Sequence, residues 1–127
     1  MFYLYRDNFC NDLKKVHNTI FNILENISCI VSDGEQLFNI RLILSELLIN
    51  AYEHGNGCDH NKSISIRFEI NDQVINIEVV DEGQGIKNNC GYDYRELKSC
   101  GRGLLIVEKL TDKMEIRKNV IRCSLSI

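Results

Sequence analysis

The sequence predicts a two-layer α/β sandwich of the α+β kind, with a mixed, mostly antiparallel sheet covered on one face by about three helices. Two apolar stretches with helical spacing open the chain and a third follows residue 100. Alternating apolar and polar residues mark strands in the middle and at the end. The 127 residues include no Pro and no Gly/Ser-rich linker, so we expect a single domain over residues 1–127.

The first 53 residues are expected to form a short edge strand followed by two helices. Residues 2–5 suit the strand, and residues 9–30 suit the first helix, because apolar side chains recur there at helical spacing: Leu13, Val16, Ile20, Phe21, Leu24 and Ile27. The second helix runs from about residue 34 to residue 52 or 53, with a capping sequence at 32–35. It is apolar nearly all round, which predicts a buried helix.

Polar residues interrupt one side of this second helix. Glu46, Asn50 and Glu53 are spaced i, i+4, i+7 and therefore project together. A solvated stripe is one interpretation. In the other, a carboxylate and a carboxamide face a cavity, where the amide oxygen can hold a hard cation and the carboxylate can take a proton.

Two alternating segments, 63–70 and the strand that begins at Ile75, flank a turn at 71–73 and predict an antiparallel pair. Counting by twos from Ile75 carries the inward face to Asp81. An inward carboxylate needs a hydrogen-bond donor, and the exocyclic amino group of adenine is a suitable one. Gly83 and Gly85 would let the main chain approach a ring. The alternative is a strand that simply ends in an Asp-Glu-Gly turn.

The last segment places Gly101, Arg102 and Gly103 before an apolar run at 104–110, which predicts a short buried helix. A helix N-terminus flanked by glycine exposes unpaired N–H groups that suit phosphate oxygens, and Arg102 can add charge. A plain glycine-rich loop with an exposed arginine is the alternative. Residues 114–118 and 120–127 then predict a closing hairpin.

Composition argues against several other classes of protein. The chain is 44% hydrophobic and 26% charged with a net charge of -3, which suits a soluble protein without a nucleic-acid surface. No apolar run approaches the roughly 20 residues of a membrane span, and the first residues lack signal-peptide character, so we expect a cytoplasmic protein. Six cysteines without a C-x-x-C pair predict reduced structural thiols. P-loop and dinucleotide fingerprints are absent.

Three segments, in this order, resemble the N, G1 and G2 boxes of the GHKL ATPase superfamily: E-x-x-x-N-A-x-x-H-G at 46–55, D-E-G-x-G at 81–85 and G-R-G-L at 101–104. The form of the first box, the length of the chain and the short stretch at 87–100, which would be the ATP lid, look most like the anti-sigma-factor serine/threonine kinases. The resemblance covers about residues 34–127 and implies the Bergerat, or histidine kinase-like ATPase, fold. One departure is Lys118-Asn119-Val120, where relatives have Gly-Thr.

The resemblance also implies ligands and residue roles. It implies that ATP or ADP binds with Mg²⁺, that Asn50 holds the metal ion, and that Asp81 reads adenine. Glu46 would be the general base, taking the proton from a protein hydroxyl group or a water. The other nucleotide-binding residues implied by the resemblance are Glu53, His54, Gly83, Gly85, Ile86, Gly101, Arg102, Gly103 and Leu104.

The function implied by the resemblance is that of an ATP-dependent serine/threonine kinase. It would transfer the γ-phosphate of ATP to a Ser or Thr of a small antagonist protein, and sequester a sigma factor or another regulator when not occupied by that antagonist. A homodimer is also implied. Two alternatives stay open: a nucleotide-gated protein-binding module without useful catalysis, and the detached ATPase domain of a histidine kinase.

Overall fold

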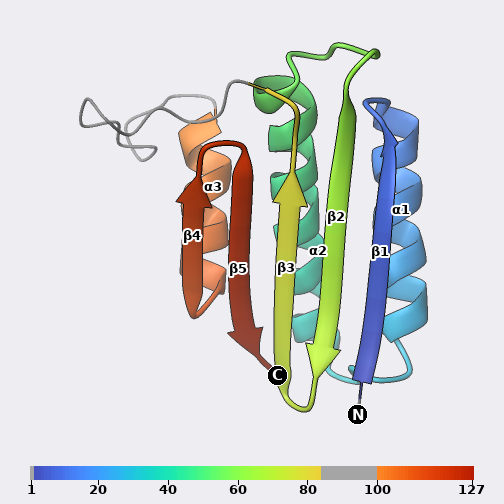
Figure 1. Ribbon diagram of the computed structural model, residues 1–127. Coiled ribbons are helices and arrows are strands. Elements are labelled where there is room, and N and C mark those ends of the chain that lie inside the picture. The colour runs from blue at the N-terminus through green and yellow to red at the C-terminus, as the bar shows by residue number, and fades with distance from the viewer. Residues whose placement is uncertain (1, 84–99) are drawn as a thin grey trace.

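A computed structural model describes residues 2–83 and 100–127 of the chain. The elements it describes are, in chain order, β1 (Phe2–Cys10), α1 (Leu13–Ile27), α2 (Gly34–Asn50), the π-helical turn η1 (Ala51–Gly55), β2 (Ser63–Asn71), β3 (Val74–Val80), α3 (Cys100–Leu110), β4 (Lys113–Arg117) and β5 (Val120–Ser126). The strands form one sheet in the order β1-β2-β3-β5-β4, and its four pairings are all antiparallel. The three α-helices lie against one face of this sheet (Figure 1). The predicted two-layer sandwich is confirmed.

The hydrophobic core fills the space between the helices and the sheet. Alternate residues of the central strands face it, as their period-2 patterns predict: Ile64, Ile66, Phe68 and Ile70 from β2, and Ile75, Ile77 and Val79 from β3. From α2, five side chains are fully buried: Ile40, Ile43, Leu44, Leu47 and Leu48. The prediction of a buried helix holds for these residues, whereas Phe38 of the same helix is 62% exposed.

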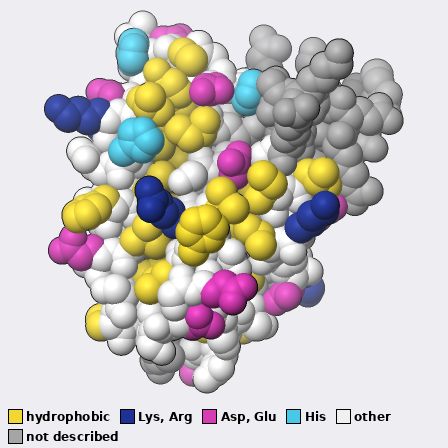
Figure 2. Space-filling view, turned by 180° about the vertical axis from the view of Figure 1, so that it is seen from behind, with side chains coloured by type: hydrophobic (Ala, Val, Ile, Leu, Met, Phe, Trp, Pro, Cys, Tyr) yellow, Lys and Arg dark blue, Asp and Glu magenta, His cyan; other side chains and the backbone are white. Residues whose placement is uncertain are grey.

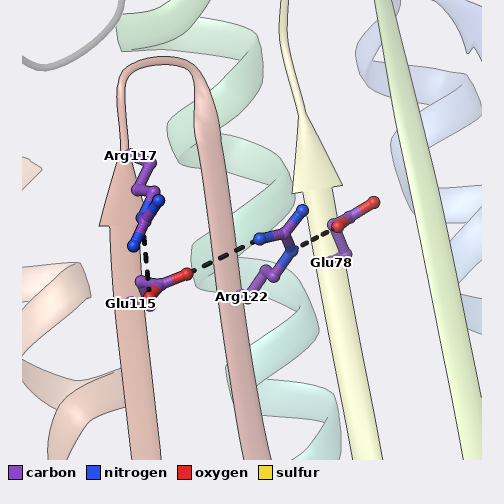
Figure 3. A network of polar contacts seen from close by, with 4 residues as sticks. All are labelled: Glu78, Glu115, Arg117 and Arg122. Atoms are coloured by element: carbon purple, nitrogen blue, oxygen red, sulfur yellow. Dashed lines mark hydrogen bonds and ion pairs between the residues drawn. The ribbon is translucent and has the colours of Figure 1, made fainter.

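The other face of the sheet carries charged side chains and no covering helix among the described residues. Arg122 of β5 lies between two acidic side chains from the neighbouring strands (Figure 3). Its Nε is 2.5 Å from Oε2 of Glu78, and its Nη1 is 3.5 Å from Oε1 of Glu115. These pairs follow from the register, which sets Arg122 opposite both residues. A row of charges of this kind suits a face that contacts water.

The strand at the N-terminus is longer than predicted, and the first helix is shorter. Phe9, which was expected in the helix, lies in β1 opposite Ile64 and is only 7% exposed. The helix begins after Asp12, whose side chain accepts a hydrogen bond of 2.9 Å from the N–H of Lys14 as an N-cap. Pairing with β2 over nine residues therefore overrides the helical periodicity at the start of the segment.

Exposed apolar side chains lie on the outer side of the helical layer. Leu13 and Phe21 of α1 are 40% and 64% exposed, and Phe38 of α2 is comparably exposed. Figure 2, which views the molecule from the helical side, shows hydrophobic side chains gathered on this surface. None of the described helices has the length and apolar character needed to cross a membrane.

Candidate functional site

Three chain segments meet at one end of the molecule: the carboxyl ends of α2 and β3 and the amino end of α3 (Figure 1). The close approaches between them are made at glycines. Gly55 at the end of η1 lies against the carboxylate of Asp81, which follows β3, and Gly103 of α3 lies against the carboxylate of Glu46 on α2. The fold thus brings together residues from all three sequence boxes.

Asp81 is the buried acid that the strand pattern predicts. It is 8% exposed, and its Oδ1 accepts a hydrogen bond of 2.8 Å from the N–H of Gly83. Burial raises the pKa of this carboxyl group, and the Gly83 N–H partly opposes that shift. Within residues 2–83 and 100–127, the N–H of Gly83 is the one donor to this carboxylate, and the second oxygen, Oδ2, lies toward Gly55.

The main chain of Asp81 is held by Asn119, in the turn between β4 and β5. The N–H of Asp81 donates to the carbonyl oxygen of Asn119 at 3.1 Å, and the Nδ2 of Asn119 donates to the carbonyl oxygen of Asp81. Lys118 takes a left-handed conformation, with φ of 55°, which lets two residues join the strands. Asn119 therefore fixes both main-chain polar groups of the buried acid.

At two glycines, a side chain would overlap neighbouring atoms unless these moved. A Cβ on Gly55 would lie 2.9 Å from Oδ1 of Asp81 and closer still to Oδ2, whereas real Cβ atoms essentially never approach within 3.0 Å. A Cβ on Gly83 would overlap the carbonyl oxygen of Gly55. The end of η1 and the segment after β3 are therefore packed main chain to main chain beside the buried carboxylate.

Glu46 and Asn50 lie one turn apart on α2 and are both partly buried. A Cβ on Gly103 would lie 3.3 Å from Cδ of Glu46 and closer to Oε2, so the first turn of α3 passes directly over this carboxylate. Gly101 and Arg102 were expected to precede the helix, but α3 begins at Cys100 and contains them.

The last predicted residue of the third box, Leu104, is 1% exposed and belongs to the hydrophobic core. Its side chain therefore anchors the first turn of α3 to the core. Any contact between this residue and a ligand would come from its main chain.

The helical spacing that placed Glu53 beside Glu46 and Asn50 does not continue past Asn50. The π-helical turn η1 begins at Ala51, where the N–H of Asn56 donates to the carbonyl oxygen of Ala51 at 2.8 Å. Glu53 and His54 are exposed, and their side chains are 3.8 Å apart between Oε2 and Nε2. The wider turn breaks the spacing on which the predicted alignment of Glu53 depends.

The comparison with known protein families agrees with this geometry. Residues 9–125 match the family described as "Histidine kinase-like ATPase domain". The chain belongs to this family.

Curated proteins named "Anti-sigma F factor" are similar to it. The one from Clostridium perfringens strain 13 is 34% identical over 88 residues, 65% of this chain and 63% of that protein. The one from Geobacillus stearothermophilus is 32% identical over 92 residues, 68% of this chain and 63% of that protein. The match thus spans less than two thirds of the length of these relatives.

In this histidine kinase-like ATPase domain, two predicted site residues, Gly85 and Ile86, lie outside the described residues, as does the segment 84–99 that contains most of the predicted lid. Sequence reasoning missed several residues that support the site: Gly55, Asn56 and Asn119. Gly55 lies inside the first box, and Asn119 marked a departure from the superfamily pattern. Asn56 carried no signal of this role, because its partners Asn11 and Glu82 are distant in the sequence.

Proposed function

We propose that this chain is an ATP-dependent protein serine/threonine kinase with the regulatory role of an anti-sigma factor, built as one domain. The observation that carries the proposal is the buried carboxylate of Asp81, which accepts a hydrogen bond from Gly83 and lies between the glycines Gly55 and Gly83. The exocyclic amino group of adenine would donate a hydrogen bond to this carboxylate.

The phosphate end of the nucleotide would lie between α2 and the start of α3. The first N–H groups of α3 have no partner within the helix, and they suit phosphate oxygens. Gly101, Arg102 and Gly103 all belong to this first turn. Glu53 and His54, at the exposed end of η1, are the remaining candidates for this end of the site.

The protein oxygen that suits Mg²⁺ here is the side-chain amide of Asn50. Among the described residues, no three His, Cys, Asp or Glu side chains converge on a metal position. That agrees with an ion that takes few protein ligands and binds chiefly phosphate oxygens and water. When bound, Mg²⁺ would neutralise phosphate charge during transfer.

Glu46 is the candidate general base, one helical turn before Asn50 and beneath the first turn of α3. Its carboxylate would take the proton from a Ser or Thr hydroxyl as that oxygen bonds to the γ-phosphorus. The bond from the γ-phosphorus to the β-γ bridging oxygen breaks, and ADP leaves. Positioning dominates the catalysis of such transfers, and Gly103 holds the main chain close to Glu46.

The partners follow from the relatives and from the surface. Relatives that are 30–34% identical are named anti-sigma F factors, so we propose a sigma factor and a small antagonist protein as partners. The exposed apolar side chains on α1 and α2 suit a protein contact (Figure 2). Among the described strands, β1 lies at the edge of the sheet, which suits a homodimer.

The test is phosphate transfer from γ-labelled ATP, with Mg²⁺, to the sigma-factor antagonist of the same organism. We expect acid-stable label on a Ser or Thr of the antagonist. Glu46→Ala is expected to lose transfer and keep ATP binding. Label on the antagonist at wild-type rate in Glu46→Ala would remove Glu46 from its role.

The same assay separates the two alternatives. Tight binding of nucleotide and partner without any label would favour a nucleotide-gated binding module. Acid-labile label on a histidine would favour the ATPase domain of a histidine kinase.

A further inference from the structure

A buried network of side-chain amides adjoins the proposed adenine site, because it bonds to Glu82, the residue after Asp81. Its centre is Asn56, which is 1% exposed and follows η1. Its Oδ1 accepts a hydrogen bond of 2.8 Å from the N–H of Glu82, and its Nδ2 donates at 3.0 Å both to Oδ1 of Asn11 and to the carbonyl oxygen of Ser63. One side chain thus joins the ends of β1 and η1, the start of β2 and the segment after β3.

The neighbours of Asn56 are themselves held. Asn11 is fully buried, and its Nδ2 donates to the carbonyl oxygen of Tyr52 at 3.3 Å. The carboxylate of Glu82 accepts from the N–H and the Oγ of Ser63, at 2.5 and 2.7 Å. The residue next to Asp81 is therefore tied at its main chain by Asn56 and at its side chain by Ser63.

A buried amide is costly unless it is fully hydrogen-bonded, and well-packed apolar residues can stabilise a fold equally well. The amide of Asn56 is directional, however, and one of its three bonds ends on the main chain beside the ligand-reading acid. Gly55 already contacts the carboxylate of Asp81, so a shift of η1 toward β3 would make these two residues clash.

We propose that Asn56 is a positioning residue for nucleotide binding, which ties the main chain of Glu82 to the end of η1 and so sets where the carboxylate of Asp81 lies. This inference rests on the proposed function, because it assumes that Asp81 reads the amino group of adenine. Asn56 would then shape the selectivity of the site without touching the ligand.

The test compares the dissociation constants of ATP and inosine triphosphate, which presents a carbonyl oxygen in place of the amino group. In Asn56→Ala we expect ATP to bind about tenfold more weakly, because the charge-assisted hydrogen bond from the adenine amino group to Asp81 would be weakened. Inosine triphosphate should change by less than about twofold, so the preference for ATP collapses. A purely structural role would weaken both nucleotides equally.

The network supplies a matched control and a conservative variant. Asn11→Ala removes bonds of the same buried network and leaves the Asn56–Glu82 bond, so it should lower the melting temperature and keep the preference for ATP. Asn56→Asp keeps an acceptor for Glu82 and loses both donors, so it should also keep that preference.

If the wild-type protein prefers ATP and Asn56→Ala keeps that preference, the inference is wrong and the proposed function stands. If the wild type binds neither nucleotide, or binds both equally, the proposed adenine site is wrong and the inference falls with it. Should neither Asn56 variant fold, hydrogen exchange of the wild type decides: the amide of Glu82 should be protected without nucleotide, and exchange at the rate of a free loop would refute the bond.

Discussion

Replacing Gly55 by Ala tests the proposed site at the point where it has least room. The new Cβ would lie 2.9 Å from Oδ1 of Asp81 and closer still to Oδ2. The main chain of Asp81 is bonded on both sides to Asn119, and that of Glu82 to Asn56. The carboxylate itself must therefore rotate away, by up to about 1 Å, at a cost of about 1 kcal/mol for leaving its rotamer.

A displacement of that size breaks the hydrogen bond that we assign to the adenine amino group. Hydrogen bonds to charged groups contribute about 1.5–3 kcal/mol, which corresponds to a loss of affinity of about 10- to 100-fold for Gly55→Ala. Stability should change little, because Ala is favoured over Gly in a helix by about 0.5–1 kcal/mol and offsets the rotamer cost.

The assay is displacement of a fluorescent ADP analogue by ATP, with a thermal melt of each protein. Gly34→Ala is the matched control, since Gly34 begins α2 and a Cβ there would meet nothing within 4 Å. It should bind ATP as the wild type does and melt at the same or a slightly higher temperature. If Gly55→Ala bound ATP within twofold of the wild type, the assignment of Asp81 as the base-reading residue would be wrong.

Three further predictions concern other contacts of the site. Gly103→Ala would push the carboxylate of Glu46 aside, so steady-state kinetics should show kcat reduced at least tenfold, with ATP affinity unchanged within about twofold. Asn119→Ala removes the side-chain bond to the carbonyl of Asp81, and calorimetry should show ATP binding weakened about fivefold, whereas Asn76→Ala on the outer sheet face should not. Asp81→Asn should raise the melting temperature at pH 7: burial raises the pKa of Asp81, so ionisation opposes folding, and the gain should vanish below about pH 3.9, where the acid is protonated in both states. A gain independent of pH would refute that cause.

Much of the fold was predictable because its signals are local. The alternation in β2 and β3 places Asp81 on the inner face, and the Asp33 cap, whose Oδ1 accepts from the N–H of Glu35 at 2.9 Å, marks the start of α2. The extent of β1 was not predictable in this way, because residues 6–10 join the sheet by pairing with β2, more than 50 residues away.

The site was predictable as a list of residues and not as an arrangement. Three boxes indicated Glu46, Asn50 and Asp81. Helical spacing alone, however, does not reveal that a π-helical turn follows Asn50 and changes the spacing at Glu53. The hydrogen bond between Asn56 and Glu82 joins residues 26 positions apart, and the one between Asn119 and Asp81 joins residues 38 positions apart. No periodicity in the sequence encodes such pairs.

Each role proposed for the site depends on a hydrogen bond between adenine and the buried acid Asp81 of this histidine kinase-like ATPase domain. Calorimetric titration of the wild type and of Asp81→Asn with ATP and ADP, with and without Mg²⁺, tests it most directly. We expect micromolar, magnesium-dependent binding by the wild type and a loss of affinity of at least tenfold in Asp81→Asn, although that variant remains folded. Equal binding by the two proteins, or no binding by the wild type, would contradict it.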